Sequence, residues 1–171
     1  SVRELIEYAK ANPGKLNFGS SGSNTLQHFA GELFNHLAGV KNVHVPYKGT
    51  ASVIPAMLSG EVQLGFGSLI GTRSQMESGR LRGIAITAAK RSPSIDFPTL
   101  AESGVPGYEV DQWYGVITSS SVPQPIVRKL NAAIVEALQQ PDVAARLAAD
   151  GSTPVGSSPE QLAATMKADI A

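Results

Sequence analysis

Apolar and polar residues alternate along this chain in two rhythms, one typical of helices and one typical of strands. The clearest helical pattern lies between residues 26 and 38, where apolar residues recur at i, i+3, i+4, i+7, i+8, i+11 and i+12. These residues are Leu26, Phe29, Ala30, Leu33, Phe34, Leu37 and Ala38. The spacing places them on one continuous face, and Gly39 is a typical residue to end such a helix.

Weaker patterns predict the remaining elements. The other helices are expected at residues 2–11, 50–58, about 72–77, 126–138, 141–149 and from 159 onward, with a helical turn at 99–104. Short apolar segments bounded by turn residues predict strands at residues 16–19, 42–47, 62–67, 81–88 and 108–119. Ser158 and Gln161 have the spacing of a capping box for the last helix.

Strands that alternate with helices at this spacing predict an α/β fold, with a mainly parallel sheet covered by helices on both faces. The pattern changes to almost pure helix between residues 119 and 125. We therefore expect two parts, residues 1–117 and residues 118–171. The chain also begins and ends within helix-like segments, which suggests a piece of a longer protein.

Composition narrows the function classes. The chain has 171 residues, of which 42% are hydrophobic and 16% charged, and its formal net charge is zero. Without a basic surface, nucleic-acid binding is not expected. The absence of cysteine excludes disulfides, thiol nucleophiles and thiolate metal sites. No apolar run approaches the roughly 20 residues needed to span a bilayer.

The turn "GSSGSNT", residues 19–25, is the first candidate for chemistry because it links a strand to the strongest helix. In a parallel sheet such a turn lies at the carboxyl edge, where open α/β sheets bind ligands. The free N–H groups of the helix start favour an anion, and four side chains add hydroxyl donors. These belong to Ser20, Ser21, Ser23 and Thr25. The alternative is a flexible turn with Ser23 or Asn24 as N-cap.

Two further turns have related features. In "YKGTAS", residues 47–52, Lys48 either pairs with a carboxylate or is simply solvated. The segment "GFGSLIG", residues 65–71, nearly matches the dinucleotide fingerprint but has one residue too many before its last glycine. No acidic residue follows at the distance expected for a ribose, so we do not expect a dinucleotide site or any other cofactor.

His28, Glu32 and His36 recur every four residues, a spacing that can hold a metal ion. They lie on the polar side of the helix without an evident fourth ligand, so no metal site is predicted. Catalysis has no motif in its favour, since the G-x-S-x-G elbow, the P-loop and paired catalytic carboxylates are all missing. Trp113 and Tyr114 could line a ligand cleft, although aromatic residues in a strand are more often core.

Long stretches of the sequence resemble the tripartite tricarboxylate transporter receptor family, the Bug-type extracytoplasmic solute-binding proteins. The resemblance runs almost from end to end. The most specific stretches are the "VPYKG" turn and the "RSP" to "PTLAESGVPGYE" segment. It implies a two-lobed fold of the type II periplasmic binding-protein class and a periplasmic location. It also implies a receptor without enzymatic activity, which captures a small carboxylate and delivers it to membrane permease subunits.

The resemblance also assigns residues. It implies that residues 1–117 form the complete second lobe and that residues 118–171 form a helical return toward an incomplete first lobe. Three of its loops match family ligand loops, which gives the candidate site residues Ser20, Ser21, Gly22, Ser23, Asn24, Thr25, Lys48, Gly49, Thr50 and Ser68. The family often has an aspartate where this chain has Gly67.

The family normally begins with a first-lobe segment that is absent from this sequence. We therefore expect that the apolar face of Ile126, Leu130 and Ile134 can be exposed and can cause self-association. Two other functions remain open. A serine of "GSSGS" could act in a small hydrolase, with His28 as the nearby base. The protein could also be a ligand-responsive sensor or interaction module.

Overall fold

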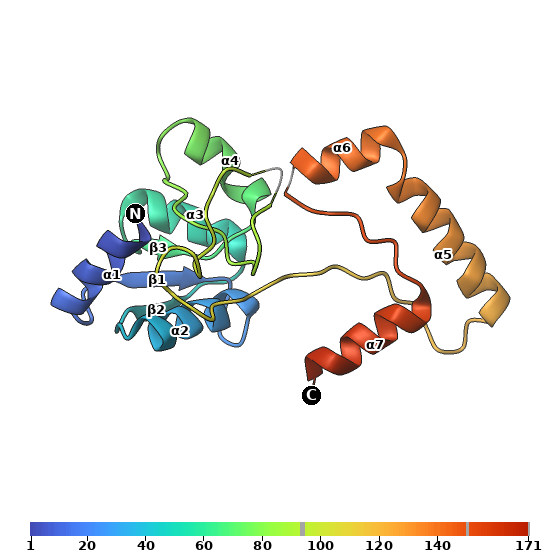
Figure 1. Ribbon diagram of the computed structural model, residues 1–171, viewed down its shortest axis with the longest axis horizontal. Helices are drawn as coiled ribbons and strands as arrows, with labels where there is room; N and C mark the ends of the chain where they lie inside the picture. The colour runs from blue at the N-terminus through green and yellow to red at the C-terminus, as the bar shows by residue number, and fades with distance from the viewer. Residues whose placement is uncertain (93–94, 150, 171) are drawn as a thin grey trace. The chain divides into compact units, whose positions relative to one another are not determined.

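The computed structural model describes residues 1–92, 95–149 and 151–170. The chain forms two compact units, an N-terminal unit of residues 1–112 and a C-terminal unit of residues 113–171 (Figure 1). The break between the units lies shortly before the boundary that the sequence analysis expects between residues 117 and 118. The assignment of the two parts to lobes stays a prediction.

The N-terminal unit contains a three-stranded parallel sheet in the order β2-β1-β3. In the register, Phe18 of β1 pairs with His44 of β2 on one side and with Leu64 of β3 on the other. Helices separate the strands (Figure 1). The elements are α1 (Val2–Ala11), β1 (Asn17–Ser20), α2 (Leu26–Ala38), β2 (Val43–Pro46), α3 (Thr50–Ser59), β3 (Leu64–Gly65) and α4 (Leu69–Glu77). The parallel sheet is confirmed.

Helices cover both faces of this sheet because neighbouring residues of β1 point in opposite directions. The ring of Phe18 packs directly over Gly31 of α2, where a Cβ atom would collide with it. Gly19 faces the other way, where an added Cβ atom would lie 2.9 Å from Val53 of α3. The expected α/β fold with helices on both faces is therefore confirmed.

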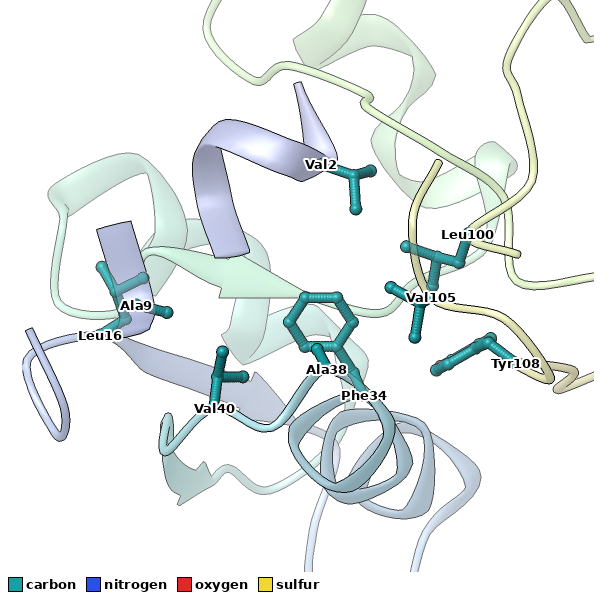
Figure 2. Close-up of a cluster of buried hydrophobic side chains, with 9 residues drawn as sticks. All are labelled: Val2, Ala9, Leu16, Phe34, Ala38, Val40, Leu100, Val105 and Tyr108. Carbon is teal, nitrogen blue, oxygen red and sulfur yellow. The ribbon is translucent and has the colours of Figure 1, made fainter. Parts of the chain in front are cut away.

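The main core joins α1, α2 and the chain segment around residues 100–108 (Figure 2). Phe34 lies in the middle of the cluster, with Val40 on one side and Val105 on the other. Its buried members are Val2, Ala9, Leu16, Phe34, Ala38, Val40, Leu100, Val105 and Tyr108. The Tyr108 hydroxyl donates to the Ala30 carbonyl at 2.9 Å, and burial raises the pKa of Tyr108 above its usual value. This bond ties the segment to α2.

The strands expected at residues 81–88 and 108–119 are not formed, so those predictions are wrong. Residues 81–88 make one isolated bridge, between Ile86 and Thr99, and the backbone of Ile86 bonds to Pro98 and Leu100. Apolar residues of both segments still pack against the core, among them Ile84, Ala85 and Val110. Burial alone therefore produced the apolar pattern. The Ser- and Pro-rich sequence of residues 90–98 predicts a loop, and residues 93 and 94 within it lie outside the described part.

The C-terminal unit contains α5 (Gln124–Leu138), α6 (Pro141–Ala149) and α7 (Pro159–Ile170). The expected capping box is present, since the Gln161 amide donates to Ser158 Oγ at 3.2 Å and the Ser158 amide donates to Gln161 Oε1 at 2.8 Å. Neither α5 nor α6 contains a buried residue in its described part. Trp113 and Tyr114 are 46% and 82% exposed, so they do not form a core. In the described residues, no helix is both long and apolar enough to cross a membrane.

Gly31→Ala tests the close packing of α2 on the sheet. The new methyl group would collide with the Phe18 ring, so we expect the free energy of unfolding to fall by about 1–3 kcal/mol. Gly71→Ala is the matched control, because it also lies in a helix and its Cβ atom would meet nothing closer than 3.7 Å. Urea denaturation followed by circular dichroism measures both. Equal unfolding midpoints for the two variants would contradict the packing described here.

Candidate functional site

A hollow open to solvent lies where β1 and β3 end and α3 and α4 begin, and its space of about 380 Å³ includes the solvent at its mouth. We refer to it as the cavity. Parallel pairing places the ends of these strands at one edge of the sheet, so the turns that follow them meet there. The cavity is lined by Gly19, Ser20, Ser21, Gln27, Thr50, Val53, Ile54, Met57, Gly65, Phe66, Gly67, Ser68, Gly71 and Thr72.

The lining combines hydroxyl groups with apolar side chains and contains no charged residue. Ser21, Thr50 and Ser68 supply hydroxyls from three different turns. The apolar part consists of Val53, Ile54, Met57 and Phe66. A lining of this composition suits a small molecule with an apolar stem and a polar end group.

Backbone amides at the start of α2 already donate hydrogen bonds to side chains of the same segment. Its N-cap is Thr25, rather than the expected Ser23 or Asn24, and Thr25 Oγ1 accepts from the His28 amide at 3.4 Å. The Asn24 amide donates to His28 Nδ1 at 3.1 Å. The Gly22 amide donates to Ser20 Oγ at 3.2 Å. Several donors of this turn are thus already occupied within the protein, as the capped-turn alternative requires.

The starts of α3 and α4 differ from that of α2. Their N-caps are Gly49 and Ser68, and neither cap residue forms a side-chain hydrogen bond with its helix. Thr50 and Ser68, at these two helix starts, both line the cavity. The first N–H groups of a helix lack intrahelical partners and carry partial positive charge. This pair of helix starts therefore makes the cavity suitable for an anion without a charged side chain.

Ser20 has a structural role. Its side chain is completely buried, its Oγ lies 2.6 Å from His44 Nε2, and it donates to the Gly22 carbonyl at 2.9 Å. A nucleophile must reach its substrate, and a buried hydroxyl held on both sides cannot. The histidine beside it is His44 rather than the expected His28. The contact follows from the parallel register of β1 and β2, which puts His44 on the same sheet face as Phe18 and Ser20.

The structure brings four of the ten candidate residues to the cavity, namely Ser20, Ser21, Thr50 and Ser68. The other six do not line it, and these are Gly22, Ser23, Asn24, Thr25, Lys48 and Gly49. Sequence reasoning missed Gln27, which accepts from Ser21 Oγ at 2.8 Å, and Thr72, which donates to the Ser68 carbonyl at 3.1 Å. The part of any of these residues in ligand binding stays a prediction.

The polar face of α2 carries His28, Glu32 and His36, whose spacing raised the question of a metal ion. His28 Nε2 lies 3.9 Å from Glu32 Oε1, and the His28 ring stacks on His44. Within the residues that the structure describes, no group of three histidine or acidic side chains could hold a metal ion.

Comparison with known proteins gives consistent results. A family model described as tripartite tricarboxylate transporter family receptor matches residues 1–171. A protein from the tcbD-tcbE intergenic region of Pseudomonas sp. (strain P51) is 35% identical over 170 residues, which is 98% of this chain and 51% of that protein. The chain thus spans about half the length of that protein and of protein BugT from Bordetella pertussis.

Three solved structures have the same fold over 99% of this chain, which covers 57% of each of them. Rpa4515 from R. palustris, solved with adipate, has a TM-score of 0.94 and 36% identity. The periplasmic binding protein BugD has a TM-score of 0.88 and 32% identity. MatC from Rhodopseudomonas palustris, solved with bound malate, has a TM-score of 0.78 and 31% identity.

Ser20→Ala tests the structural role of this serine. The change removes the partner of His44 Nε2 and of the Gly22 amide, so we expect a loss of about 1–3 kcal/mol in the free energy of unfolding. Ser23→Ala is the control, since Ser23 is exposed in the same turn and should change stability by no more than about 0.5 kcal/mol. Thermal and urea unfolding measure both variants. A Ser20→Ala protein as stable as the control would argue against the buried bond.

Proposed function

Because the chain belongs to the tripartite tricarboxylate transporter family of receptors, which bind solutes and are not enzymes, we propose that it captures a small carboxylate in the cavity at the starts of α3 and α4. We further propose that it presents this solute to the permease subunits of a membrane transporter. One observation carries the proposal. The cavity has no charged lining residue and lies at the starts of α3 and α4, where neither N-cap residue forms a side-chain hydrogen bond with its helix.

One carboxylate oxygen would accept from the first backbone amides of α4 and from the Ser68 hydroxyl. The other would accept from those of α3 and from the Thr50 hydroxyl, and from the Ser21 hydroxyl once its hydrogen turns from Gln27 to the ligand. Oriented amide and hydroxyl dipoles can hold an anion together without an arginine or lysine in contact. Lys48 and Gly49 directly precede Thr50, so we keep them in the proposed site at its rim.

The apolar lining suggests the rest of the solute. Val53, Ile54, Met57 and Phe66 offer a surface for a hydrocarbon stem, and burying that stem would add affinity. Rpa4515 was solved with adipate, a dicarboxylate with such a stem, and MatC was solved with malate, a dicarboxylate with a shorter stem. We therefore propose a dicarboxylate as the solute of this protein.

We also propose that the two units contribute to two lobes of a longer receptor in the periplasm. The share of each relative that this chain covers supports the proposal, as does the periplasmic location of BugD. The C-terminal unit lacks buried residues in the described parts of α5 and α6. In the longer relatives, additional chain is available to cover such helices.

Ser68→Ala and Ser21→Ala test the binding site in the protein expressed from its complete reading frame. Each variant should weaken adipate binding about fivefold, since each loses one hydrogen bond to a carboxylate. Ser23→Ala is the matched control, because Ser23 is in the same turn as Ser21 but does not line the cavity. Isothermal titration calorimetry gives the affinities. Unchanged affinity in both test variants would remove this cavity from consideration as the site.

The exposed face of α5 generates a second test, on the 171-residue chain alone. Ile126 and Leu130 are 50% and 48% exposed, whereas Ile134 of the expected face is partly buried. We expect this chain to self-associate with increasing concentration, because exposed apolar surface favours contact between copies.

Replacing both Ile126 and Leu130 by serine should shift the self-association to higher concentration. Val155→Ser is the control, since Val155 is 83% exposed but lies outside α5. Sedimentation velocity measures the distribution of species. A monomer at every concentration, or an equal effect of the control, would contradict the role of this face.

A further inference from the structure

Two histidine rings stack on each other beside the turn of residues 20–25. His28 lies in the first turn of α2 and His44 in β2, with ring centroids 3.9 Å apart and planes inclined by 19°. His44 also stacks with Phe18 of β1, with ring centroids 5.0 Å apart. The pair is therefore held between a helix and the sheet, and neither the fold nor the proposed carboxylate contacts account for it.

Each ring holds one end of the turn. His44 Nε2 lies 2.6 Å from Ser20 Oγ at the beginning of the turn, and His28 Nδ1 accepts from the Asn24 amide at 3.1 Å near its end. Ser21 lies between these two points, lines the cavity and donates to Gln27. The position of a cavity wall thus depends on two bonds that involve imidazole nitrogens.

The backbone of the turn needs this support. Asn24 has a φ of 62°, and no other described non-glycine residue has a positive φ. The left-handed region is sparsely populated by residues with a Cβ atom, although asparagine tolerates it better than most. The bond from the Asn24 amide to His28 Nδ1 stabilises this conformation, and losing the bond would favour a different turn.

We propose that the stacked His28–His44 pair positions the turn of residues 20–25 while both rings are neutral, and that protonation of the pair loosens the turn and weakens ligand binding. This inference rests on the proposed function only for its effect on the ligand, because the turn and its histidines can be observed without one. His28 and His44 are positioning residues, since they act through Ser20 and Asn24.

The chemistry of the rings gives the direction of the effect. A proton on His28 Nδ1 would replace an acceptor by a donor that faces the Asn24 N–H group, so the bond would be lost. A charge on both rings would bring two like charges together. Glu32 of α2 is the other titratable group recorded beside the pair, while the facing residues of β1, Phe18 and Ser20, do not titrate in this range.

Burial lowers the pKa of His44 below its usual value of about 6.5, the neighbouring His28 lowers it further, and Glu32 partly offsets both effects. The folded protein therefore resists protonation that the unfolded chain accepts. The stability that depends on a neutral His44 ring is therefore fully present at pH values above the usual histidine pKa, and it is lost as the pH falls below that value.

Nuclear magnetic resonance of ¹⁵N-labelled protein from the complete reading frame tests the device without a ligand. We expect the Asn24 amide signal to shift toward that of a free amide as the His28 and His44 rings titrate. His36 provides the internal control, because it is exposed in the last turn of the same helix. An Asn24 amide that stays constant while His28 and His44 titrate would overturn the proposal.

The ligand readout uses adipate in calorimetry at about pH 7.5 and about pH 5.5. Adipate itself takes up protons in this range, so affinities are compared as ratios between variants at each pH. His28→Gln removes the titrating ring, and His36→Gln is the matched control. For each protein, the quantity compared is the fall in adipate affinity from the higher to the lower pH. We expect this fall to be about fivefold larger in the wild type and in His36→Gln than in His28→Gln.

Equal losses in the three proteins would overturn the effect on the ligand. If adipate binds none of them at either pH, the proposed solute fails, while the Asn24 amide and the histidine signals still decide whether the pair controls the turn. If the Asn24 amide signal of the His28→Gln variant shifts with pH as it does in the wild type, the role assigned to His28 is also contradicted.

Discussion

Parallel pairing of β1 with both β2 and β3 is the constraint on which the site depends. Each parallel neighbour requires the chain to leave at the carboxyl edge and return through a crossover helix. The starts of α2, α3 and α4 are consequently brought to one edge of a small sheet. Close packing fixes them there: Phe18 fills the space that only a glycine at position 31 leaves open, and Gly19 lets Val53 approach from the opposite face. The cavity is a result of this arrangement.

The three helix starts then have different roles. The start of α2 satisfies its own donors through Thr25, Ser20 and the stacked histidines, so it acts as a wall. The starts of α3 and α4 receive no such caps from Gly49 and Ser68 and can offer amides to a guest. A cavity lined by dipoles and hydroxyls needs no buried charged side chain, which would be costly to desolvate, and it can still attract an anion. Lys48 is exposed and is not among the residues that line the cavity.

The sequence predicted elements best where helical periodicity coincided with clear end signals. Residues 2–11, 26–38 and 141–149 are helical with the expected bounds. The strand predictions for residues 81–88 and 108–119 were wrong because an apolar segment can pack against a core without joining a hydrogen-bonded sheet. Ile84 and Val110 pack in this way. Of the residues that line the cavity, local turn chemistry indicated Ser20 and Ser21, and the family resemblance added Thr50 and Ser68. Turn chemistry could not indicate Gln27, Thr72 or the contact of Ser20 with His44, since these depend on register and on how helices pack.

The central claim is that neutral donors at the starts of α3 and α4 hold the carboxylate. A crystal structure of the protein from its complete reading frame, grown with adipate, tests this most directly. We expect a carboxylate group within hydrogen-bonding distance of the first amides of both helices and of the Ser68 hydroxyl, with the stem along Val53 and Phe66. A carboxylate bound instead by charged side chains outside this cavity, with the helix starts facing only water, would contradict it.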